Sequence, residues 1–102
     1  AKDITRMKAE QKNKALIGLD NFKRSSDDEE KLNSAFTALF STDIGMSVLQ
    51  YLKSITIESV AGPEIADNSL RHLEGQRYIV GLIQRRVNKG KSQNIVKENN
   101  NG

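Results

Sequence analysis

The 102-residue sequence contains no cysteine, no tryptophan and a single histidine, His72. Without cysteine the chain can form neither a disulfide, nor a thiolate nucleophile, nor a Cys-ligated metal site. One histidine leaves no routine way to build an imidazole metal site within one chain. We therefore expect no metal and no cofactor.

Long apolar runs are missing as well. No stretch approaches the roughly 18 apolar residues of a membrane span, and the Lys-rich N-terminus is not followed by the apolar core of a secretory signal. We expect a soluble protein that is synthesised in the cytoplasm and does not associate with a membrane.

Residue groups that could begin catalysis are sparse. His72 has only Asp67 and Glu74 as acidic neighbours in the sequence, with no Ser, Cys or metal partner at motif spacing. The acidic run 27–30 is explained by helix capping and by the helix dipole. The glycines never cluster into a phosphate-binding loop. The sequence thus predicts no enzyme and no small-molecule substrate.

The size and composition favour one small folded domain. Apolar residues make up 36% of the chain and charged residues 28%, which is enough apolar material to fold but not enough for a large core. The net charge of +3 hides an asymmetry. Residues 1–24 hold seven basic and three acidic residues, residues 25–76 three and nine, and residues 77–102 six and one. The basic ends could pair with the acidic middle, contact phosphate, or be solvated helix faces.

Capping signals predict three helices. A capping box at Ser26–Glu29 opens a helix over 27–40. Ser41–Asp43 caps a second helix, which has Gly45 in its first turn. Asp67–Ser69 opens a third helix, which runs from 69 to 89 and stops at Gly90. The stripe of the first helix comprises Leu32, Ala35, Phe36, Leu39 and Phe40, and its opposite side carries Glu29, Glu30, Asn33 and Thr37.

The remaining segments lack a clear period. Residues 4–23 are read as a further helix, whose polar first half is a basic arm and whose second half docks through Leu16, Leu19 and Phe22. Residues 56–63 are read as an extended linker, with strand pairing between molecules as the alternative, and the polar residues 91–102 as a tail that is disordered alone.

The predicted fold is an all-α bundle of three to four helices over residues 16–90, with an extended basic N-terminal arm over 1–15 and a polar tail over 91–102. The expected core comprises Phe22, Leu32, Phe36, Leu39, Phe40, Val48, Leu49, Leu52, Leu73, Val80 and Ile83.

The basic residues at both ends are the first candidate partner-binding groups. No helix-turn-helix spacing, zinc knuckle or aromatic platform accompanies them, so a sequence-specific DNA reader is not expected. We expect them to dock on partner proteins, with incidental, sequence-indifferent DNA contact as an alternative. These candidates are Lys8, Lys12, Lys14, Arg85, Arg86 and Lys89.

A second candidate is the segment Glu74-Gly75-Gln76-Arg77. A glycine inside a long helix costs about 1 kcal/mol relative to alanine, which suggests a packing reason. Gly75 could admit a partner helix or a tight crossing within the chain. Glu74 and Arg77 could pair with each other or clamp a neighbouring backbone.

Two apolar motifs resemble a known family. They are Phe36-x-x-Leu39-Phe40-Ser41-Thr42-x-x-Gly45-x-x-Val48-Leu49-x-x-Leu52 and, after a loop, Glu74-Gly75-Gln76-Arg77-x-Ile79-Val80-x-x-Ile83. This arrangement is similar to a family of small virion-associated proteins of tailed phages, typified by a protein of a Bordetella podophage. The match covers residues 36–84 and departs at Gln76, where the family favours a basic residue.

The resemblance implies a phage-encoded structural protein and transfers no catalytic residue. We expect a multi-copy component of the virion that binds larger virion proteins around the portal, the neck or the internal ejection apparatus, with copies of itself in a ring. Two alternatives stay open: a small basic DNA-associated or regulatory phage protein, and a capsid decoration or scaffolding protein.

Overall fold

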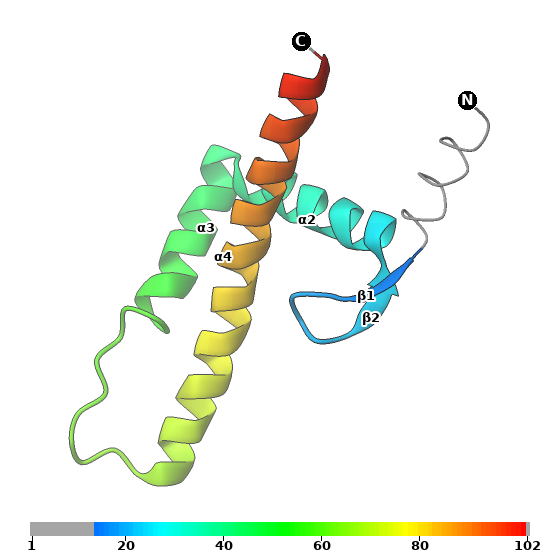
Figure 1. Ribbon diagram of the computed structural model, residues 1–102. Helices are drawn as coiled ribbons and strands as arrows, with labels where there is room; N and C mark the ends of the chain where they lie inside the picture. Colours follow the sequence, from blue (N-terminus) through cyan, green and yellow to red (C-terminus); the bar gives the residue numbers. More distant parts are fainter. Residues whose placement is uncertain (1–13, 102) are drawn as a thin grey trace.

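A computed structural model describes residues 14–101, with side chains up to Ile95. Three helices pack together beside a small hairpin, which confirms the predicted all-α class (Figure 1). The described chain extends 64 × 30 × 16 Å with a radius of gyration of 17.9 Å, against about 12–13 Å for a compact chain of this length. The molecule is therefore elongated and thin. Within residues 14–101 no helix combines the length and the apolar character that a membrane span requires.

The segment predicted to be the end of an N-terminal helix forms a β-hairpin instead. Strands β1 (Ala15–Ile17) and β2 (Lys23–Ser25) pair antiparallel, with Leu16 opposite Arg24. The loop turns at Asn21, whose φ of 71° lies in the left-handed region that asparagine tolerates. Asp20 accepts a hydrogen bond from the Phe22 amide at 3.1 Å, so local turn chemistry outweighs the weak helical pattern. The prediction that this segment docks on the helices through Leu16 and Phe22 is wrong, because both side chains are exposed.

Helix α2 (Ser26–Phe40) matches the predicted 27–40, but its cap is one residue earlier. The Ser25 hydroxyl, rather than that of Ser26, accepts a hydrogen bond from the Asp28 amide at 3.1 Å. Glu29 does not reach back to the cap, because its carboxylate is buried among cationic partners. The capping box is therefore replaced by a single serine cap.

Helix α3 (Asp43–Ser54) begins where the sequence predicts. The Thr42 hydroxyl accepts a hydrogen bond from the Gly45 amide at 2.9 Å, as an N-cap should. Gly45 is buried, and a β-carbon there would collide with the Leu39 carbonyl oxygen. The glycine thus lets α3 turn tightly away from the end of α2.

Helix α4 (Asp67–Asn101) is the longest element, and the predicted end at Gly90 is wrong. Gly90 lies inside the helix and is buried where α4 crosses α2. A β-carbon at Gly90 would lie 2.5 Å from the Asn33 carbonyl oxygen and closer still to the Thr37 hydroxyl. This glycine permits a close helix crossing instead of ending the helix, and the helix continues through residues predicted to form a tail.

The apolar core is small. Leu49, Val80 and Val87 are its fully buried members. Partly buried side chains pack around them: Phe36, Phe40, Leu52 and Ile83. Three predicted core residues are instead largely exposed: Phe22, Leu39 and Val48.

Polar side chains occupy the crossing of α2 and α4, which is the most extensive contact between elements. Glu29, Asn33 and Thr37 recur every four residues on α2, and all three are buried. The sequence pattern predicted that this face lies opposite the core, and that prediction is wrong. The side chain that makes its burial possible is Arg86 of α4, which is only 2% exposed.

Candidate functional site

Arg86 belongs to a buried ionic network rather than to a binding surface. Its Nη1 donates to Asn33 Oδ1 at 2.8 Å and to Glu29 Oε2 at 3.1 Å, while its Nη2 lies 3.3 Å from Asp20 Oδ2. Its guanidinium also lies over the Phe36 ring, 5.9 Å from the centroid. Arg86 is therefore committed inside the chain, and its assignment as a partner-binding residue is wrong.

The same network ties the hairpin to both helices. Arg24 forms ion pairs with Asp20 at 2.7 Å and with Glu29 at 2.6 Å, and the Leu19 amide donates to Glu29 at 3.0 Å. Hydrogen bonds from Arg24 hold the pKa of Asp20 far below its usual range. Burial alone would raise the pKa of Glu29, but hydrogen bonds from the Leu19 amide, Arg24 and Arg86 outweigh it and lower that pKa. Both carboxylates are thus ionised at neutral pH.

Arg77 acts as the predicted backbone clamp. Its Nη1 pairs with Glu74 at 2.7 Å, its Nε donates to the Thr56 carbonyl at 2.9 Å, and its Nη2 donates to the Ser59 carbonyl at 2.5 Å. These bonds fasten the chain between α3 and α4 onto α4. The predicted pair of Glu74 and Arg77 is confirmed, and the backbone clamp is made by Arg77 alone. Binding of a partner by these two residues stays a prediction.

Gly75 does not sit at a crossing of helices. It is exposed, and a β-carbon added there would meet no atom of the described residues within 4 Å. The prediction of a tight crossing within the chain is wrong at Gly75; the crossing is at Gly90. Admission of a partner helix at Gly75 stays a prediction.

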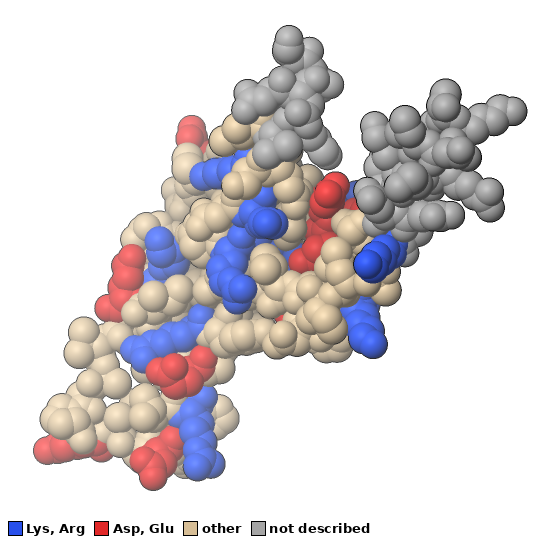
Figure 2. All heavy atoms as spheres, in the orientation of Figure 1, with Lys and Arg blue, Asp and Glu red and all other residues tan. Residues whose placement is uncertain are grey.

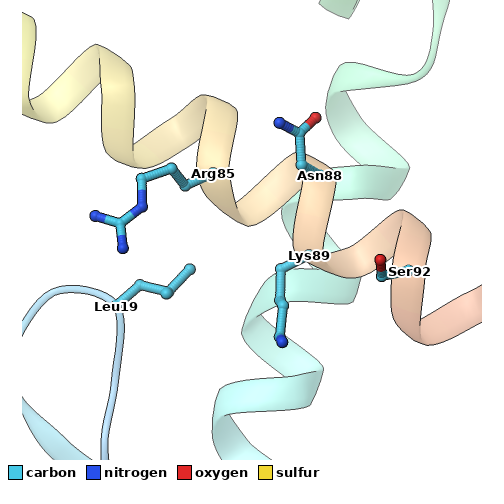
Figure 3. Close-up of a pocket in the computed structure, with 5 residues that line it drawn as sticks. All are labelled: Leu19, Arg85, Asn88, Lys89 and Ser92. Carbon is cyan, nitrogen blue, oxygen red and sulfur yellow. The ribbon is translucent and has the colours of Figure 1, made fainter.

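Arg85 and Lys89 lie one turn apart on the exposed face of α4. They line an open pocket of about 300 Å³ together with Leu19, Asn88 and Ser92. Figure 2 shows a run of cationic side chains along the middle of α4. In Figure 3 the Leu19 side chain points from the hairpin loop toward the space between Arg85 and Lys89. The structure therefore brings together two of the predicted cations and adds a hairpin residue that the sequence analysis did not assign to them.

The N-terminal cations have little structural context. Lys8 and Lys12 lie outside the described residues. Lys14 is exposed at the start of the hairpin, and its carbonyl accepts a hydrogen bond from the Ser26 amide at 3.2 Å.

An apolar stripe on α3 is the largest feature that sequence reasoning missed. Ile44, Val48 and Tyr51 of α3 and its C-cap residue Ile55 follow spacings of four, three and four residues, which place them on one helix face. They are 79%, 47%, 56% and 50% exposed, whereas Leu49 on the neighbouring face is 7% exposed. The spacing was visible in the sequence, but the core-facing residues of the same helix masked it. We call these four residues the α3 stripe.

Within the described part of the chain, no group of three or more His, Asp or Glu side chains is placed to hold a metal ion. His72 is exposed on the first turns of α4. Comparisons with protein-family models, with curated proteins and with solved structures found no match to this chain. They add nothing to the resemblance described above, which rests on the residues quoted for it.

Proposed function

We propose that this chain is a non-enzymatic structural component of a tailed-phage virion, present in multiple copies and bound to larger virion proteins near the portal, the neck or the internal ejection apparatus. It is made in the host cytoplasm and incorporated into the particle. The observation that carries the proposal is the α3 stripe, which leaves a continuous apolar helix face exposed on a thin molecule.

The balance of buried and exposed apolar surface supports an assembly role. Soluble monomers rarely expose contiguous apolar patches, and such patches mark interaction sites. Here three apolar side chains form the fully buried core, and a helix face with heptad-like spacing is open. A partner that covers this face would add the apolar burial that so small a domain lacks. We therefore assign the α3 stripe to contact with a larger virion protein.

The proposed location of the protein in the virion rests on the resemblance over residues 36–84. Its first motif spans the end of α2 and most of α3, and so includes Val48 of the stripe. A protein inventory of purified particles separates the regulatory alternative from this proposal, because a regulatory protein does not remain with the particle. The capsid decoration or scaffolding alternative differs in the place of the protein within the particle, which a density map locates.

The test combines a particle inventory with matched variants. The stripe variant is Val48→Glu with Tyr51→Glu, and the control is Ser47→Glu with Gln50→Glu, which adds the same charge at exposed positions on another side of α3. We expect quantitative mass spectrometry to find the wild-type and control proteins in purified particles and the stripe variant reduced about tenfold or more, because charge in an apolar contact is strongly disfavoured. Circular dichroism should show equal helicity. Absence of the wild-type protein from particles, or equal incorporation of both variants, would contradict the proposal.

A further inference from the structure

The cations beside the hairpin and along α4 differ in whether they are paired. Arg24, Arg77 and Arg86 each form ion pairs within the chain. Arg85 and Lys89 form none with the described residues, although they lie on the middle of α4 beside the hairpin loop. Neither side chain is thus needed to neutralise an acidic group of the described fold.

The lining of the pocket favours an anion. Its members are two cations, the amide of Asn88, the hydroxyl of Ser92 and the apolar Leu19, and no carboxylate is among them. Asp20 follows Leu19 in the chain, but its carboxylate is held by Arg24 and Arg86. Glu30 lines the adjoining groove, which shares Leu19 and Lys89 with this pocket. Arg24 and Arg86 balance the carboxylates of Asp20 and Glu29, so Arg85 and Lys89 have only Glu30 of the adjoining groove against them and one positive charge remains.

We propose that this pocket binds a phosphodiester group of a nucleic-acid backbone. The guanidinium of Arg85 can donate two parallel hydrogen bonds to phosphate oxygens, and Lys89 supplies a second positive charge one turn away. The hydroxyl of Ser92 and the amide of Asn88 lie on the rim as further donors, and the apolar Leu19 offers a surface for the sugar.

Two features favour a backbone phosphate over an acidic peptide. A phosphate presents oxygens in several directions and can accept from two cations and a hydroxyl together, whereas a carboxylate presents its two oxygens in one plane. The pocket is also open rather than enclosed, so a polymer can pass across it. No Phe, Tyr or Trp lines the pocket to stack on a base, so binding is indifferent to sequence. This inference is independent of the proposed function, because the pocket shares no residue with the α3 stripe.

The experiment measures binding of the full chain to a short fluorescent DNA duplex, by anisotropy, over a series of KCl concentrations. The pocket variant is Arg85→Gln with Lys89→Gln. Its control, Lys53→Gln with Arg71→Gln, removes the same charge from α3 and from the start of α4. Two unrelated duplex sequences are compared, with inorganic phosphate and an oligoglutamate peptide as competitors.

We expect the pocket variant to bind about tenfold more weakly than the control at low salt, with a salt slope smaller by about one, because the one phosphate contact that is lost contributes about 0.9 to that slope. Both duplex sequences should bind alike, and inorganic phosphate should compete. Equal affinity of the two variants would overturn the proposal. Binding of inorganic phosphate without binding of the duplex would also overturn it, because the ligand would then be a free phosphate. So would displacement of the labelled duplex by oligoglutamate at a lower concentration than by unlabelled DNA, because the ligand would then be an acidic protein segment.

Discussion

The two halves of α4 are packed in different ways. The first half, up to Ile83, packs against α3 through apolar side chains such as Val80 and carries the Arg77 clamp. The second half crosses α2 through Arg86, Gly90 and Gln93, which meet a polar face of that helix. Apolar contact dominates the first half, and the Arg77 clamp adds hydrogen bonds to it. The second half also buries Val87, but its crossing with α2 is made by hydrogen bonds and ion pairs that require one geometry.

This difference separates two tasks of the molecule. Buried charges are tolerated only when they are paired and hydrogen-bonded, so the crossing fixes how α2 and the hairpin sit on α4. Apolar contact is non-directional, and α3 keeps one apolar face exposed. The fold thus has a crossing of α2 and α4 with one fixed geometry at one end and an exposed apolar face on α3 at the other.

Substitution of one glycine in each half should change stability in opposite directions. We expect Gly90→Ala to lower the free energy of unfolding by about 1–3 kcal/mol, because its β-carbon would collide with Asn33 and Thr37. Gly75→Ala should instead raise it, by up to about 1 kcal/mol, because the site is open and alanine favours the helix. Urea unfolding followed by circular dichroism measures both. Destabilisation by Gly75→Ala in the isolated protein would mean that Gly75 has a packing role within the chain.

Acid should weaken the crossing of α2 and α4 by less than Gly90→Ala does, and it should leave the apolar contact between α3 and α4 unaffected. Asp20 and Glu29 have pKa values lowered by folding, so their stabilising contribution is fully present above their unfolded values, about 4 to 4.5. It is lost progressively as the pH falls below those values toward the folded pKa. Urea midpoints measured from pH 7 down to pH 3 should therefore fall, and Glu29→Gln should flatten that dependence. A midpoint independent of pH in the wild type would contradict the ionic account of the crossing.

Local signals predicted the elements that caps define. Thr42 and the acidic run after Ser25 placed the starts of α3 and α2 within one residue, because a side-chain oxygen that satisfies an amide acts over three residues of sequence. The partnership of Glu74 and Arg77 was visible for the same reason, since residues three apart share a helix face.

Features set by distant contacts could not be predicted in this way. Gly90 looks like a helix end until α2 is placed against it, and Glu29 looks solvated until Arg86 approaches from 57 residues away. The hairpin strands span only three residues each, too few for a period, although Asp20 and Asn21 are turn residues that could have indicated it. Of the candidate site, Arg85 and Lys89 were predicted, but the loop that completes their pocket was not.

The central claim is that a buried ion pair between α2 and α4 determines the crossing, and a double-mutant cycle tests it most directly. Arg86→Met removes the donor to Asn33 and one of the two cationic partners of Glu29, which keeps Arg24, and should cost about 1–3 kcal/mol of unfolding free energy. Glu29→Met combined with Arg86→Met replaces both charges by apolar groups. The double variant should be more stable than the sum of the single effects by about 0.5–3 kcal/mol. If Arg86→Met alone does not fold, the double variant should regain a cooperative urea transition. Additive effects, or wild-type stability of Arg86→Met, would contradict the account.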